Sequence, residues 1–322
     1  MHRRHLLALP ALIPALAHAQ TAAWPNRTVT MVAPLAAGSS VDIMARLVAE
    51  QWATRLPGQV VVENRPAANG TLAMEQVSRS APDGYTAVLI GQTGVAFNPH
   101  IYPALRYDPL KDFTYVSTLA GVSNALVVRA ASPFHSVADI LAAARAAPGR
   151  LTYSSGGVGT THHVSSAMLA QMTGVEFTHV PYRGAPQGIL AVTTGEVDFA
   201  YYNISTILGG VRGGTLRALA VTSPTASAFL PGVPTMVEAG VPGYQMQTWF
   251  GVATVAGTPA PIIDRMWEVT RGMLADEAVR RRLTELGFEL VEPVPPEGMP
   301  ALVQAEHAKW GPILRAAGAR VE

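Results

Sequence analysis

The chain has 322 residues, of which 49% are hydrophobic, and a formal net charge of +1. This length and composition allow a large buried core and predict two lobes rather than one, while the near-neutral charge gives no reason to expect binding to nucleic acid or to a membrane surface. The chain contains no cysteine, which excludes disulfide bonds, thiol chemistry and cysteine-based metal sites.

Residues 1–19 have the pattern of a secretory signal peptide. Arg3 and Arg4 give a basic start, residues 6–16 form an apolar run too short to cross a bilayer, and small residues precede Gln20. We therefore predict cleavage before Gln20, and the arginine pair leaves twin-arginine export open as an alternative. The mature chain keeps 21 basic and 22 acidic residues, a formal charge of −1.

The stretch from Thr28 to Trp52 predicts a strand, a loop of small residues and a helix. Residues 28–33 are β-branched or apolar, and Pro34 ends the strand because it lacks an N–H donor. The sequence predicts that residues 38–40 (Gly-Ser-Ser) leave backbone N–H groups free at the start of the helix, where an anion is attracted. An ordinary turn with a serine cap is the alternative.

Two later stretches repeat this pattern. Residues 151–172 place a Ser/Gly/Thr loop, residues 154–161, before a helix, and residues 177–192 place a helix after Gly184. Loops of this kind converging from two lobes would surround both ends of a small anion.

The remaining chain alternates strands with helices, which predicts an α/β fold with parallel sheets and functional loops at their carboxyl edges. Further strands are predicted at residues 60–64, 85–90, 125–128, 216–222 and 249–255, and further helices at about 71–80, 136–147, 261–274, 277–286 and 296–317.

Many short motifs, in order, resemble the Bug or TctC-like receptors, the periplasmic substrate-binding components of tripartite tricarboxylate transporters. The similarity runs from about Trp24 to the end of the chain. The motifs are Val32–Asp42, Glu63–Pro66, Ala81–Thr86, Tyr107–Pro109, His179–Gly184, Leu216–Thr222, Val233–Thr235, Glu238–Tyr244 and Ala256–Pro259.

The resemblance implies a type II periplasmic binding protein, a flytrap with a βα sheet in each lobe and two crossing strands, near residues 119–125 and 219–224. We accordingly expect a first lobe built from residues 20–122 and 222–322, including the C-terminal helices, and a second lobe of residues 123–221.

The resemblance also implies a periplasmic monomer that binds a small carboxylate between its lobes, without a cofactor, and delivers it to membrane permease subunits. A ligand-sensing subunit for a membrane signalling protein is an alternative that the sequence leaves open. The predicted ligand-binding residues are Leu35, Ala36, Gly38, Ser39, Gln92, Thr93, Asn98, Ser154, Ser155, Thr160, Thr161, His162, Tyr182, Arg183, Gly184 and Asn203.

Two departures from the family pattern concern the ligand. Ser39 follows Gly38 where family members usually have a second glycine, and Tyr202 precedes Asn203 where an aspartate is frequent. An aspartate there could bind an ammonium group, so its absence argues against an amino acid ligand.

Metal binding and catalysis are the less favoured interpretations. Adjacent His162 and His163 point about 100° apart on a helix, and no carboxylate stands at ligand spacing. Ser154 or Ser155 with His162 and Asp198 supplies the residue types of a hydrolase triad, but the Gly-x-Ser-x-Gly motif is missing. We therefore predict neither a metal site nor an enzyme.

Overall fold

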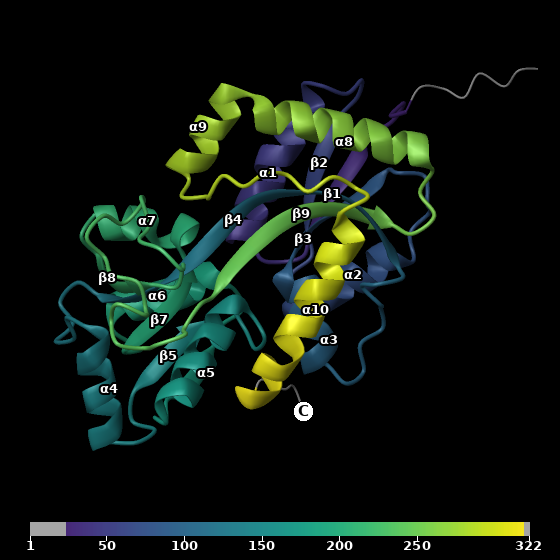
Figure 1. The fold of residues 1–322 in the computed structure, drawn as a ribbon. Helices are drawn as coiled ribbons and strands as arrows, with labels where there is room; N and C mark the ends of the chain where they lie inside the picture. Colours follow the sequence, from purple (N-terminus) through teal and green to yellow (C-terminus); the bar gives the residue numbers. More distant parts are fainter. Residues whose placement is uncertain (1–23, 319–322) are drawn as a thin grey trace, which may run out of the picture.

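Two neighbouring strands, β4 (Phe113–Arg129) and β9 (Gln247–Val255), run through the centre of a curled nine-stranded sheet in the computed structural model, which describes residues 24–318 (Figure 1). The strand order is β2-β1-β3-β9-β4-β7-β5-β6, and β8 also pairs with β4. Helices gather around each end of this sheet in two lobes (Figure 1). The predicted two-lobed α/β fold is therefore confirmed.

The first lobe surrounds three parallel strands. Along β1 and β3, successive side chains point to opposite faces, so Met31 and Leu89 pack toward α1, α8 and α9, whereas Val32 and Val88 pack toward α2, η2 and α10. The elements are β1 (Val29–Ala33), α1 (Ser40–Ala53), β2 (Val60–Asn64), η1 (Ala68–Gly70), α2 (Thr71–Ser78), β3 (Thr86–Gly91), η2 (Thr93–Phe97), α3 (Asn98–Ile101), α8 (Ala260–Ala275), α9 (Glu277–Glu285) and α10 (Met299–Ala316).

The second lobe surrounds the far half of β4. Strands β5 and β7 are parallel, and β7 and β8 are antiparallel to β4. The elements are α4 (Val137–Ala146), β5 (Thr152–Ser155), α5 (Thr161–Thr173), β6 (Thr178–Pro181), α6 (Ala185–Thr194), β7 (Phe199–Asn203), α7 (Ile204–Arg212) and β8 (Leu216–Val221). Helix α7 is not predicted from the sequence, because its two adjacent glycines weaken a helical pattern.

The two sheet halves meet at Ser123 and Asn124. Ser123 pairs with Gln247, the first residue of β9, and Asn124 pairs with Asn203 of β7. We therefore propose that the first crossing, predicted near residues 119–125, lies at Ser123 and Asn124.

The second crossing, by which the chain returns to the first lobe, is predicted near residues 219–224. Residues 222–246 pack on the second lobe: the Met236 amide donates to the Val221 carbonyl, and the Tyr244 hydroxyl donates to the Ser165 carbonyl. We therefore propose a second crossing at Met246–Gln247, and the remaining lobe boundaries stay predictions.

The predicted signal peptide lies outside the described residues. No helix among residues 24–318 combines the length and the apolar character needed to cross a bilayer.

Gly251 lets β9 approach β4 closely, and we expect Gly251→Ala to destabilise the fold. An added Cβ would lie 2.6 Å from the Ser117 carbonyl oxygen, so the two strands would have to separate at a cost of about 1–3 kcal/mol. Gly272→Ala is the matched control, because Gly272 is exposed in α8 with no atom near its missing Cβ; it should raise the free energy of unfolding by about 0.5–1 kcal/mol. Urea unfolding measures both, and equal stabilities would contradict the prediction.

Candidate ligand-binding site

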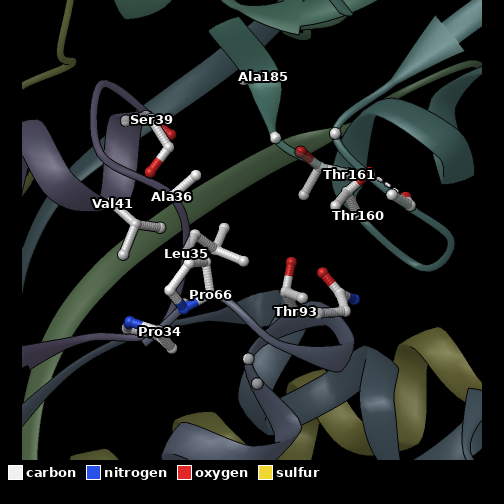
Figure 2. A pocket seen from close by; sticks show the side chains of 18 of the residues that line it. Pro34, Leu35, Ala36, Ser39, Val41, Pro66, Thr93, Thr160, Thr161 and Ala185 are labelled. Atoms are coloured by element: carbon white, nitrogen blue, oxygen red, sulfur yellow. Dashed lines mark hydrogen bonds between the residues drawn. The ribbon is translucent and has the colours of Figure 1, made fainter. Parts of the chain in front are cut away.

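A cavity of about 440 Å³ lies between the lobes, lined by the loops after β1, β3, β5 and β6 and by the starts of α1, α5 and α6. Figure 2 shows Ser39, Thr161 and Ala185 converging on it from these three helix starts. All but four of the predicted ligand-binding residues line this cavity. The lining residues among them are Leu35, Ala36, Ser39, Gln92, Thr93, Thr160, Thr161, His162, Tyr182, Arg183, Gly184 and Asn203.

The other four support the walls from behind. The Gly38 amide donates to Asp42, and Asn98 donates to the Asn69 carbonyl and the Tyr107 hydroxyl. The Ser154 hydroxyl donates to the Gly188 carbonyl (2.8 Å), and Ser155 Oγ lies 2.7 Å from His179 Nε2. The Gly38 amide and the side chains of the other three residues are thus engaged within the protein.

The loop before α1 itself uses some of the amide donors that are predicted from the sequence to be free for an anion. The Gly38 amide donates to Asp42 Oδ2 (2.9 Å), the Ser39 amide donates to the Ala36 carbonyl (3.1 Å), and the Ser39 hydroxyl accepts from the Asp42 amide. The expectation of free amides at Gly38 and Ser39 is therefore wrong. Within residues 24–318 the Ser40 and Val41 amides have no acceptor, as the first helical turn requires.

Asp42 fixes this loop as a buried anion. Burial acts to raise the pKa of its carboxyl, but hydrogen bonds from Arg46, the Gly38 amide and Asn64 outweigh burial, so the pKa lies below its ordinary value. The Asp42 carboxylate thereby occupies the place within the loop that the anion of a ligand would otherwise take. Such an anion would instead meet the unpaired amides at the start of α1.

The loops before α5 and α6 also leave backbone amides at the helix start without an acceptor. The Thr160 hydroxyl caps α5 by accepting from the His163 amide (3.4 Å), which leaves the Thr161 and His162 amides without an acceptor in the described part of the chain. At α6 no side chain caps the helix, and the amides of Gly184 and Ala185 are likewise unpaired among the described residues. Three helix starts therefore offer backbone donors to one cavity.

His162 adds a neutral side-chain donor. Its Nδ1 accepts from the Gly156 amide (3.3 Å), so the proton of the neutral ring resides on Nε2. Burial lowers the pKa of His162 to about 4, with a smaller opposing effect of Asn203, and the residue is only 5% exposed. Nε2 is buried and has no hydrogen-bond partner in residues 24–318. An acceptor atom of a ligand in the cavity would supply this missing partner.

Ser40, which is not among the ligand-binding residues predicted from the sequence, joins the two lobes at the cavity. Its hydroxyl donates to Asn203 Oδ1 (2.7 Å), and Asn203 Nδ2 donates to Asn124 Oδ1 (2.6 Å). Close contact continues at Gly184, where an added Cβ would lie 2.8 Å from Ala36 Cβ of the other lobe. The lobes are thus in direct contact around the cavity.

Apart from Arg183, the rest of the lining is neutral and largely apolar. Among the described residues, no carboxylate lines the cavity and Arg183, an exposed residue, is the one arginine or lysine there. Leu35, Val41 and Phe250 contribute apolar surface. Such a lining suits a ligand with an anionic end and an apolar body.

The hydrolase alternative lacks its hydrogen bonds in the described residues. Asp198 accepts from the Thr152 amide and hydroxyl, whereas His162 engages Gly156. Ser154 donates to a backbone carbonyl. These side chains do not form the hydrogen-bonded chain of nucleophile, base and acid that a hydrolase triad requires.

A ligand cavity between two lobes joined by paired strands defines a two-lobed solute-binding protein. Residues 44–319 match the TctC family, described as "Tripartite tricarboxylate transporter family receptor", and the chain belongs to this family. The resemblance and the receptor class inferred from the sequence are thereby confirmed.

Individual relatives agree over nearly the full length. "UPF0065 protein in tcbD-tcbE intergenic region" of Pseudomonas sp. (strain P51) is 34% identical, over 91% of this chain and 87% of that protein. The structure of R. palustris Rpa4515 with adipate is 34% identical with a TM-score of 0.89, covering 92% of this chain and 100% of that chain. MatC (Rpa3494) from Rhodopseudomonas palustris with bound malate is 31% identical with a TM-score of 0.86, covering 90% and 100%.

One buried and two half-buried histidines predict that the protein loses stability in acid. Burial lowers the pKa of His162 and His163 to about 4 and that of His179 to about 3, from 6.5. Below pH 6.5 the unfolded chain therefore binds protons that the folded protein does not, and the free energy of unfolding falls as the pH drops toward 4.

Urea unfolding at several pH values measures this slope. His179→Gln removes one of these proton-binding groups, so the free energy of unfolding should fall less steeply between pH 6.5 and 4. His135→Gln, at an exposed position, should leave this slope as in the parent protein. Identical slopes in the two variants would contradict the assignment.

Proposed function

We propose that the chain is a periplasmic, monomeric receptor that binds one small carboxylate between its lobes and delivers it to the permease subunits of a tripartite tricarboxylate transporter. One observation carries the proposal: the starts of α1, α5 and α6 and the neutral donor of His162 meet at one cavity. Unpaired amides at helix starts favour an anion without needing a lysine or arginine.

The relatives support the same ligand class. The structures of Rpa4515 and MatC carry adipate and malate, which are both small carboxylates. A receptor role without catalysis agrees with the family description, and export to the periplasm agrees with the signal pattern of residues 1–19.

We further propose that the lining residues divide into two groups. The starts of α1, α5 and α6, with His162, bind a carboxylate group through N–H donors, and Ser39 and Thr161 contribute hydroxyls beside them. Residues of the first lobe such as Leu35 and Thr93 contact the rest of the ligand. Gly38, Asn98, Ser154 and Ser155 act by shaping the walls.

Titration calorimetry with mono-, di- and tricarboxylates should find at least one ligand that binds at about 1:1, because the cavity offers one cluster of anion donors. Neutral sugars and simple cations of similar size are the controls and should give no heat of binding. Binding confined to sugars or cations would overturn the proposed carboxylate class.

Gly184→Ala should weaken carboxylate binding at least about 10-fold while the protein stays folded. Gly184 has φ 170°, an extended backbone that alanine adopts readily, and the substitution keeps the amide donor. The new methyl group would meet Ala36 across the cleft, which prevents the lobes from closing on the ligand.

Gly209→Ala is the matched control, because Gly209 is exposed in α7 and no atom lies near its missing Cβ. Calorimetry should give the parent affinity for this variant, and circular dichroism should show both variants folded. A folded Gly184→Ala protein with the parent affinity would show that contact between the lobes is not needed for binding.

A further inference from the structure

Gln92, a residue that lines the cavity, carries a hydrogen-bond acceptor of fixed orientation. Gln92 Nε2 donates to Glu306 Oε2 (2.5 Å), and the same carboxylate oxygen accepts from Trp310 Nε1 (2.9 Å). A carboxylate accepts but does not donate, so the NH₂ group of Gln92 must face Glu306. The amide oxygen, Oε1, is therefore left over; it is buried without a partner in residues 24–318, on a residue that is 1% exposed and lines the cavity.

A second acceptor is fixed on Asn69 by an independent chain of contacts. Asn98 Nδ2 donates to the Asn69 backbone carbonyl (3.2 Å), which can only accept, so Asn98 Oδ1 must accept from Asn69 Nδ2 (3.0 Å). Asn98 is fully buried, and it also donates to the hydroxyl of Tyr107. Asn69 Oδ1 remains buried with no partner among the described residues, and Asn69 lines the cavity.

These acceptors belong to the first-lobe side of the cavity. Gln92 precedes Thr93, which Figure 2 shows across the cavity from Thr161 and Ala185 of the second lobe. The cavity wall thus combines N–H donors at the helix starts with two residues of the first lobe, Gln92 and Asn69, whose amide oxygens have no partner among the described residues. A carboxylate group suits the donors, but it cannot satisfy the two oxygens, because an ionised carboxylate has no proton to donate.

We propose that the ligand is a hydroxycarboxylate whose hydroxyl group donates to Gln92 Oε1 or Asn69 Oδ1. This inference rests on the proposed function and names the ligand class of the same site. An ammonium group would also donate, but among the described residues no carboxylate lines the cavity to balance its charge. A neutral hydroxyl matches acceptors in a neutral wall, and a site built to bind a hydroxyl discriminates against the analogue that lacks it.

Matched pairs of acids that differ by one hydroxyl group test the inference: malate against succinate, 2-hydroxyglutarate against glutarate, and 3-hydroxybutyrate against butyrate. In at least one pair, calorimetry should give a dissociation constant about 10-fold or more lower for the hydroxylated acid, because its partner leaves a buried acceptor unpaired. Equal affinities within twofold in every pair would overturn the inference while leaving carboxylate binding intact. Failure of all carboxylates to bind would instead overturn the proposed function.

Two substitutions assign the discrimination to these oxygens. Gln92→Met keeps a side chain of similar length without the amide, and Asn69→Gly removes the side chain at a position with φ 55°, which glycine adopts without strain. At least one of them should bring the ratio of the two dissociation constants in the discriminating pair close to 1. If both variants are folded and keep the parent ratio, the inference is wrong.

Thr161→Val is the matched control at the anion end of the cavity. It removes a hydroxyl group beside the α5 amides, so it should weaken both members of a pair by the same factor and leave their ratio unchanged. Aspartate tests the charge argument: tighter binding of aspartate than of malate would identify an ammonium group, rather than a hydroxyl group, as the donor and overturn the inference.

Discussion

The first amides of an α-helix have no acceptor within the helix, and this constraint organises the cavity. The starts of α1, α5 and α6 lie on two lobes, and each directs unpaired N–H groups at the same space. Side-chain caps at Ser39 and Thr160 satisfy only part of this need. The remaining donors require water or an anion, so the fold itself creates the affinity for a negatively charged ligand.

Building the site from neutral groups has a consequence for a transport receptor. The His162 ring is neutral at physiological pH, and the buried charge nearest the α1 loop, Asp42, is already compensated by Arg46 and by hydrogen bonds. An anion that binds here forms no buried ion pair, so its departure leaves no uncompensated cation behind. Dipoles and hydrogen bonds can therefore bind the ligand and still release it to another protein.

The local pattern of strand, small-residue loop and helix was sufficient to predict most of the lining, because it is written in contiguous residues such as those around Ser39, Thr160 and Gly184. Contacts between distant residues were not predictable from it. Gly38 faces Asp42 rather than the cavity, and the role of Ser40 depends on Asn203. The orientation of the Gln92 amide depends on Glu306, 214 residues away. The sequence pattern thus predicted which segments line the cavity, whereas the direction of each polar atom depends on packing between distant residues.

The hydrogen bond between the lobes and the junction of the two sheet halves belong to one chain of contacts. Asn124 lies directly after the junction, and its amide donates to Thr222 Oγ1 while its side chain accepts from Asn203. Asn203 in turn accepts from Ser40 of the first lobe. Because Asn124 connects the backbone junction to the cavity wall, rotation of one lobe about this point must stretch or break the bond at Ser40. Opening of the cleft is therefore resisted at the same place where the helix starts line the cavity.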